Sequence, residues 1–152
     1  MIAQWATMGE VPPRPNFAVR ADATLRRLGR TALFGWRALR DDRVETLGFR
    51  MEIPRGVPHP LLDGGTAFLA RTVGPMLAPG HRVLVLDSGA GLLALVCASR
   101  GATVWAVDAS PPARQATGRN AHAAGVGEAV RASAEAPAPG TADAFEDRKS
   151  VV

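Results

Sequence analysis

The chain has 152 residues, of which 47% are hydrophobic and 21% are charged, and its formal net charge is +4. This length and apolar share are typical of one globular domain with a buried core, so they exclude a disordered chain and a repeat array as starting points. No apolar run is long enough to cross a membrane, and the N-terminus lacks the features of a secretory signal, so the sequence predicts a cytoplasmic protein.

Cysteine and histidine give no sign of a disulfide or a metal site. Cys97 is the only cysteine, and its position within an apolar run is typical of a small core residue rather than a nucleophile. His59, His81 and His122 are scattered, with no cysteine or carboxylate at ligand spacing. The sequence therefore predicts no bound metal.

The positive charge is concentrated in the first third of the chain. Residues 1–55 contain ten arginines and six acidic residues, whereas residues 56–152 contain eight basic and eight acidic residues. A basic segment of this kind can bind an acidic partner such as RNA, or it can form the solvated face of a helix. The second interpretation is the simpler one.

The N-terminal region, residues 1–50, is expected to contain an arm, a helix and the start of a strand. Prolines in residues 1–19 predict an extended arm, and apolar residues spaced by three and four predict an amphipathic helix over 22–40. From 43 to 53 the period changes to two, which predicts a strand or a hairpin arm. A proline-rich loop follows.

A second helix is expected over 66–77. Its apolar residues recur at helical spacing, and the pattern predicts that Phe68, Leu69, Val73 and Leu77 are buried.

The next segment has the pattern of a parallel α/β sheet. The run 83–86 is continuously apolar, as in a strand covered on both faces, and a glycine-rich turn joins it to an apolar helix over 92–99. A second apolar strand over 103–107 ends at Asp108, and Ser110 caps a helix that begins with proline and extends to Ala124. The order strand, helix, strand, helix predicts a Rossmann-like α/β fold.

The glycine turn predicts a ligand site. Glycines at 89 and 91 allow a ligand to approach the backbone closely, and the following helix offers unpaired N–H groups there. Asp108 ends the next strand, 21 residues after Asp87, where its two oxygens can accept bonds from both hydroxyls of a ribose. These features together indicate a nucleoside-containing cofactor.

The same residues resemble a known family. The segments Val83-Leu-Val-Leu-Asp-Ser-Gly-Ala-Gly, Gly101-Ala-Thr-Val-Trp-Ala-Val-Asp-Ala-Ser and Arg119-Asn-Ala-His-Ala-Ala-Gly-Val are similar to the first half of the class I S-adenosylmethionine-dependent methyltransferases. The third segment is common in the branch that includes release-factor glutamine methyltransferases. The resemblance covers about residues 45–146.

The resemblance implies roles for five residues and a cofactor, S-adenosylmethionine. Gly89 and Gly91 would pass under its methionine portion, Asp87 would lie near its ammonium and carboxylate groups, and Asp108 would hold its ribose. Ser133 stands where the family has an acidic residue near the adenine, and no N-P-P-Y motif is present. The acceptor, a protein, RNA or small molecule, is left open, with a glutamine amide or another amide or base nitrogen implied by the branch.

The loop from Ile53 to Pro60 resembles the segment that those enzymes place over the cofactor. His59 within it is interpreted as incidental rather than catalytic, and Asn120 as a structural helix residue.

Two alternatives remain. Gly89-x-Gly91-x-x-Ala94 also fits the fingerprint of a nicotinamide-dependent dehydrogenase of the medium-chain type, although Asp87 would repel a pyrophosphate. A non-catalytic relative that acts as a binding partner is the other.

The sequence predicts three segments. Residues 51–146 would form a partial cofactor-binding domain after the N-terminal region, and residues 147–152 would be a non-native tail, because Asp-Arg-Lys-Ser-Val-Val reads like a translated sequencing adapter. On this interpretation the fold is incomplete at the C-terminus, the fragment itself is inactive, and one strand edge of a sheet of about three strands is left unpaired.

Overall fold

The computed structural model describes residues 40–62, 64–138 and 150–151. The chain divides into two units, and all of these residues belong to the second, Leu33–Val152. The expected arm over 1–19 lies outside the described residues, as does the expected helix over 22–40 except for its last residue. None of the helices among the described residues is long and apolar enough to cross a membrane.

An antiparallel hairpin begins the described part. Strands β1 (Asp42–Thr46) and β2 (Phe49–Ile53) pair from Asp42 opposite Ile53 to Thr46 opposite Phe49. The alternating pattern buries Met51 and Ile53 and leaves the residues between them exposed, so the predicted hairpin arm is confirmed. The proposed boundary at residue 50 falls within β2.

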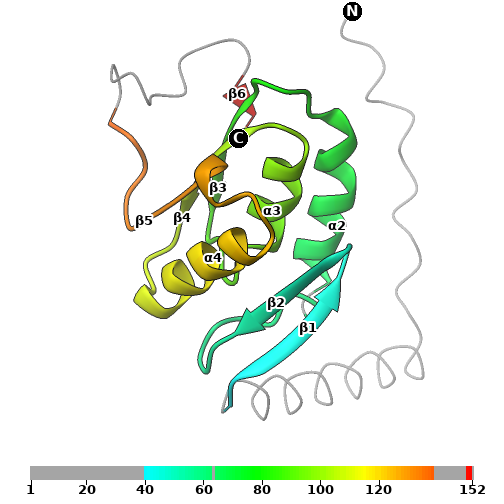
Figure 1. Cartoon of the computed structure of the whole chain (residues 1–152). Coiled ribbons are helices and arrows are strands. Elements are labelled where there is room, and N and C mark those ends of the chain that lie inside the picture. Colours follow the sequence, from blue (N-terminus) through cyan, green and yellow to red (C-terminus); the bar gives the residue numbers. More distant parts are fainter. Residues whose placement is uncertain (1–39, 63, 139–149, 152) are drawn as a thin grey trace, which may run out of the picture. The chain divides into compact units, whose positions relative to one another are not determined.

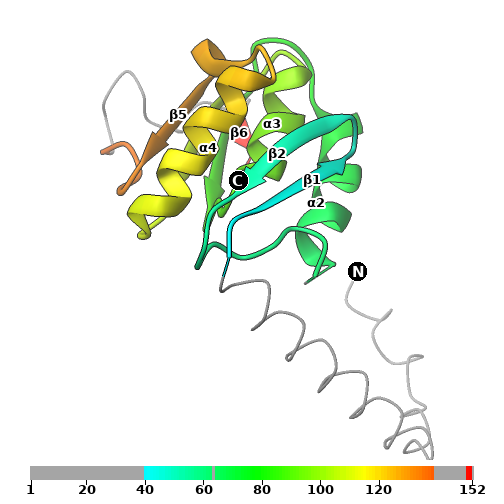
Figure 2. The same ribbon diagram turned by 60° about the horizontal axis from the view of Figure 1, so that its bottom comes forward.

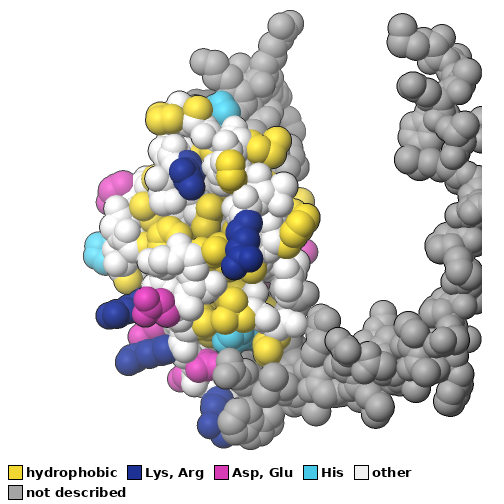
Figure 3. Space-filling view, turned by 90° about the vertical axis from the view of Figure 1, so that its right-hand side faces the viewer, with side chains coloured by type: hydrophobic (Ala, Val, Ile, Leu, Met, Phe, Trp, Pro, Cys, Tyr) yellow, Lys and Arg dark blue, Asp and Glu magenta, His cyan; other side chains and the backbone are white. Residues whose placement is uncertain are grey.

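Helix α2 (Gly65–Val73) continues into a 3₁₀ turn, η1 (Gly74–Met76). The predicted buried face is wrong in part, because Phe68 is 67% exposed and Leu69 is 47% exposed. The helix packs against α3 through small residues instead: Ala70 is buried, and a Cβ on Gly74 would lie 3.0 Å from Val96. Hydrophobic side chains are consequently spread over the surface on this side of the molecule (Figure 3).

A parallel sheet forms the centre of the fold (Figure 1). Its strands are β3 (Arg82–Leu86), β4 (Thr103–Val107), β5 (Val130–Ser133) and β6 (Ser150–Val151), in the order β5-β4-β3-β6. Helix α3 (Leu92–Ser99) connects β3 to β4. Helix α4 (Pro111–Ala123) and a 3₁₀ turn, η2 (Gly127–Ala129), connect β4 to β5. The predicted Rossmann-like α/β order is confirmed.

The described helices cover one face of this sheet (Figure 2). Val83 and Val85 of β3 and Val104 and Ala106 of β4 form a buried cluster with three residues of α3, namely Ala94, Cys97 and Ala98. The side chains that alternate with these strand residues point to the other face, where Leu86 is 59% exposed. The prediction that both faces of β3 are covered is therefore wrong for the described residues.

The edge of β3 is paired with the C-terminal strand. Ser150 lies opposite Arg82 and Val151 opposite Val83, in parallel register. The expectation of an unpaired strand edge is therefore wrong at the first two residues of β3. The pairing engages the backbone of two of the six residues interpreted as a non-native tail, and strand pairing of this kind requires little of the sequence because it uses main-chain groups.

Candidate functional site

The turn between β3 and α3 has an unusual backbone. Asp87, Gly89 and Gly91 all have positive φ, at 51°, 56° and 94°. The turn is fixed by main-chain bonds, since the Ser88 N–H donates to the Val107 carbonyl at 3.0 Å and the Gly91 N–H donates to the Ser88 carbonyl at 2.9 Å. An aspartate tolerates this left-handed conformation better than most side chains do, so its position here is compatible with a sharp turn.

Asp108 ties the glycine turn to the end of β4. Its Oδ2 accepts a hydrogen bond from the Gly89 N–H at 2.8 Å, and its Oδ1 accepts one from the Ser110 N–H at 2.9 Å. The Arg114 guanidinium donates to the carbonyls of Asp108 and Ala109, both at 2.8 Å, and fixes the same segment. Each carboxylate oxygen has a second lone pair, so both remain able to accept a bond from a ligand.

A cavity of about 390 Å³ opens at this edge of the sheet. Asp87, Gly89 and Asp108 line it, together with residues of the turn, the start of α4, the loop after β2 and the start of α2, namely Ser88, Ala90, Leu92, Ser110, Pro58, Pro60 and Thr66. Cavities of about this size hold small organic ligands and cofactors. The structure thus brings three of the five predicted site residues together.

Gly91 does not line this cavity. A Cβ at this position would lie 3.1 Å from three atoms of Thr117 on α4, so the glycine lets the turn pack closely on that helix. The Thr117 hydroxyl donates to the Gly89 carbonyl at 3.1 Å, and this bond attaches the turn to α4.

Ser133 does not line the cavity either. It ends β5, where its carbonyl accepts from the Asp108 N–H at 3.0 Å and its hydroxyl accepts from the Glu135 N–H at 3.2 Å. Ser133 therefore supports the strand end that positions Asp108.

Asn120 of α4 supports the turn from the hairpin side. This side chain is 2% exposed, and its amide forms a reciprocal pair with the backbone of Glu52, accepting at 2.8 Å and donating at 2.9 Å. It also donates to the Ala90 carbonyl at 2.9 Å. The interpretation of Asn120 as a structural residue is confirmed.

The loop after β2 contributes two residues to the cavity. Pro58 and Pro60 line the cavity, whereas His59 between them is 3% exposed and does not. Sequence reasoning missed Thr66 as a lining residue, because no motif marks it. Ser110 was recognised only as a helix cap, and its side chain does accept from the Ala113 N–H at 3.5 Å.

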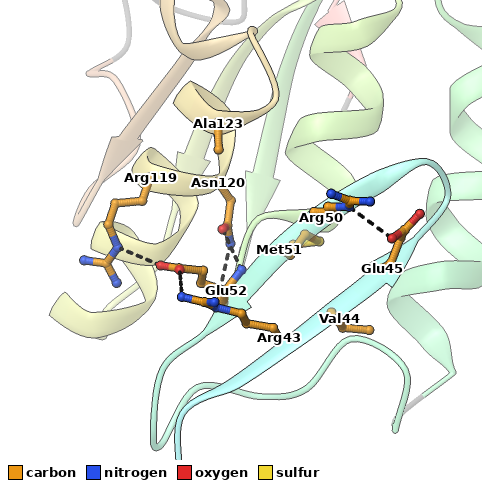
Figure 4. A pocket seen from close by; sticks show the side chains of 9 residues that line it. All are labelled: Arg43, Val44, Glu45, Arg50, Met51, Glu52, Arg119, Asn120 and Ala123. Carbon is orange, nitrogen blue, oxygen red and sulfur yellow. Dashed lines mark hydrogen bonds and ion pairs between the residues drawn. The ribbon is translucent and has the colours of Figure 1, made fainter.

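A second cavity, of about 460 Å³, lies between the hairpin and α4 (Figure 4). Its rim holds three ion pairs, with N–O distances of 3.1 Å for Arg43–Glu52, 3.1 Å for Arg50–Glu45 and 3.9 Å for Arg119–Glu52. These side chains are at least half exposed, so solvent screens the pairs and each contributes little stability. None of the five predicted site residues lines this cavity.

Among the described residues, no group of three or more His, Cys, Asp or Glu side chains is arranged to hold a metal ion. Cys97 lies in the core, and burial raises the pKa of its thiol to about 11, so the thiol is protonated at neutral pH.

Comparison with known proteins identifies the fold. The sequence matches no protein-family model and no curated protein. Solved structures do match: Trm5b from Pyrococcus abyssi at TM-score 0.53 and 23% identity, and a tRNA m1G37 methyltransferase from M. jannaschii at TM-score 0.51 and 19% identity. A transferase structure from Pyrococcus horikoshii matches at TM-score 0.53 and 17% identity.

These matches cover 60–62% of this chain but only 28–36% of the matched chains, so the chain spans about a third of their length. At this level of identity the likeness concerns the fold. The described part of the chain has the Rossmann-like α/β fold found in these solved structures.

Proposed function

We propose that the chain binds S-adenosylmethionine at the glycine turn and constitutes the cofactor-binding part of a methyltransferase. The observation that carries the proposal is the position of Asp108, whose carboxylate is held at the cavity wall beside the turn by the N–H groups of Gly89 and Ser110. The carboxylate is thereby preorganised, and its remaining lone pairs suit the two hydroxyls of a ribose.

Asp87 supports a cationic ligand. The residue lines the same cavity, within the turn where a dinucleotide would place its pyrophosphate. A carboxylate repels the negative charges of a pyrophosphate, whereas it attracts the positively charged ammonium and sulfonium groups of S-adenosylmethionine. The dehydrogenase alternative therefore gains no support from the cavity.

In this proposal, the predicted site residues have different roles in binding the ligand. Gly89 leaves its side of the turn open, because nothing lies within 4 Å of a Cβ at that position, so the ligand can approach the backbone there. In this proposal Asp87 attracts the charged end of the ligand and Asp108 fixes its ribose, while Gly91 and Ser133 act by holding the turn and the strand ends in place. S-adenosylmethionine supplies an electrophilic methyl group when it is bound, and the protein contributes position and electrostatics.

The acceptor belongs to the same proposal. On the resemblance of the Arg119 segment, we propose a nitrogen nucleophile, either a glutamine amide of a protein or another amide or base nitrogen. No described residue is assigned to acceptor binding, and the partner is identified only as a methyl-acceptor substrate.

Calorimetric titration of the 152-residue chain with S-adenosylhomocysteine and, separately, with NADH tests this function. We expect the first ligand to bind and the second not to bind, because Asp87 discriminates against a pyrophosphate. NADH binding without any response to S-adenosylhomocysteine would contradict the proposal and favour the dehydrogenase alternative. Absence of binding by either ligand would favour a non-catalytic relative.

A further inference from the structure

A histidine is buried behind the proline wall of the cavity. His59 lies in the loop between β2 and α2 and is 3% exposed, while its neighbours Pro58 and Pro60 line the cavity. The ring nitrogens of a buried histidine need hydrogen-bond partners, because the burial of a polar group without them costs free energy. Its two ring nitrogens both have partners among the described residues.

The two partners define how the ring is held. The Leu61 N–H donates to Nδ1 at 3.3 Å, so in the neutral ring the proton is on Nε2. Nε2 lies 3.5 Å from Oδ2 of Asp42, the first residue of β1. The ring therefore connects the loop to the hairpin across a separation of 17 residues in the sequence.

Other contacts attach the beginning of the loop. The Arg55 N–H donates to Oδ1 of Asp41 at 2.9 Å, and Val57 is buried in the core beside Met51 and Ile53. Beyond Val57 the loop exposes Pro58 and then returns through His59 and Pro60. Because prolines fix φ, a displacement of His59 would move both of its neighbours.

We propose that His59, through its contact with Asp42, is a positioning residue that holds Pro58 and Pro60 at the wall of the S-adenosylmethionine cavity. The proposal rests on the proposed function, because the cavity is the one assigned to that cofactor. His59 does not line the cavity, so it acts on the ligand only through the prolines. The Asp42–His59 pair then determines how tightly the loop closes over the bound ligand.

The test combines one measurement that needs no ligand with one that does. Arg55 and Gly56 are exposed within the loop, so the rate of trypsin cleavage after Arg55 reports how firmly the loop is attached. Calorimetric titration with S-adenosylhomocysteine reports the cavity. Both are measured on the whole chain with His59→Leu, His59→Gln and Asp42→Ala.

His81→Leu is the matched control. His81 also accepts a backbone N–H through Nδ1, from Ala78 at 3.4 Å, but it precedes β3 at the opposite end of the sheet from the cavity. Asp42→Ala covers the possibility that His59→Leu does not fold, because the Asp42 side chain is 28% exposed and its removal leaves no large void.

We expect His59→Leu and Asp42→Ala to accelerate cleavage and to weaken S-adenosylhomocysteine binding by roughly tenfold, because a loosened loop must be ordered again when the ligand binds. His59→Gln keeps a donor near the position of Nε2 and should retain most of the affinity, and His81→Leu should change neither measurement. Faster cleavage with unchanged affinity would show that His59 is structural only. Unchanged cleavage in Asp42→Ala would show that the pair does not hold the loop.

Failure of the proposed function has a different signature. If the unmodified chain does not bind S-adenosylhomocysteine, the assignment of the cavity is wrong and the positioning role falls with it. The cleavage rates would still show whether the pair attaches the loop.

Discussion

The two glycines of the turn have different tasks at the level of single residues. Gly91 has φ 94° and no room for a Cβ beside Thr117, whereas Gly89 has φ 56° and open space around it. The first is required by packing, and the second leaves the cavity open to a ligand. This difference is not visible in a G-x-G motif, which treats both positions alike.

Alanine at each glycine separates these tasks. Gly91→Ala should lower the free energy of unfolding by roughly 2–4 kcal/mol, because the added Cβ is both strained and overpacked. Gly89→Ala should cost only about 1–2 kcal/mol of stability but should weaken S-adenosylhomocysteine binding. Chemical denaturation and calorimetry measure the two effects. A greater loss of stability in Gly89→Ala than in Gly91→Ala would contradict the division.

The buried thiol of Cys97 should make the stability of the fold depend on pH. Burial raises its pKa to about 11, above the ordinary value of 9.0, so between these values the folded state holds a proton that the unfolded state has released. Stability associated with this thiol is therefore fully present below about pH 9 and is lost as the pH rises toward 11.

The measurement is the urea midpoint of the chain and of Cys97→Ala between pH 8 and about 10.5. Cys97→Ala should be less stable at pH 8, by about 1–2 kcal/mol, because a small core side chain is shortened. The difference between the two proteins should shrink as the pH rises. A constant difference would show that the thiol does not titrate with unfolding.

Three elements meet at Asn120, which joins the hairpin, the glycine turn and α4. Replacing it with alanine leaves the Glu52 N–H and two carbonyls without their partner. We expect Asn120→Ala to lower the free energy of unfolding by about 2–4 kcal/mol, as for a buried network that loses one member.

Gln115→Ala is the control for this element, since Gln115 is exposed on the same helix. It should change stability by less than about 0.5 kcal/mol. Equal effects of the two variants in urea denaturation would show that Asn120 is not the link between the elements.

Much of the fold is predictable from the sequence because its signals are local. Continuous apolar runs indicated β3 and β4, and Ser110 followed by proline marked the start of α4. The buried face of α2 was not predictable in the same way, because helical periodicity assigns large apolar residues to the core whereas this helix approaches α3 through Ala70 and Gly74. Asp87, Gly89 and Asp108 were found by motif. The contributions of Thr66 and the Asp42–His59 pair depend on tertiary contacts that no local pattern records.

The sheet of the whole molecule has two different faces. The described helices cover the face with Val83 and Val85, and on the other face Leu86 is 59% exposed while Trp105 stacks under the Arg131 guanidinium at 4.2 Å. An apolar surface of this kind binds hydrophobic dyes and promotes association.

We expect the isolated chain to bind such a dye and to aggregate at moderate concentration. Leu86→Lys should reduce both effects, because it places a charge on that face. Gln115→Lys, which adds the same charge at an exposed polar position of α4, serves as the control. A monomer with a sharp cooperative melt and no dye binding would contradict the expectation.

The central claim is that Asp108 holds the ribose of S-adenosylmethionine, and the most direct test is calorimetric titration of Asp108→Ala with S-adenosylhomocysteine. Charge-assisted bonds contribute about 1.5–3 kcal/mol each, so we predict at least a tenfold loss of affinity. Asp108→Asn should lose less, because its amide oxygen still accepts one bond, and Glu128→Gln, a carboxylate substitution outside the cavity, should bind like the unmodified chain. Equal affinity of Asp108→Ala and the unmodified chain would contradict the account.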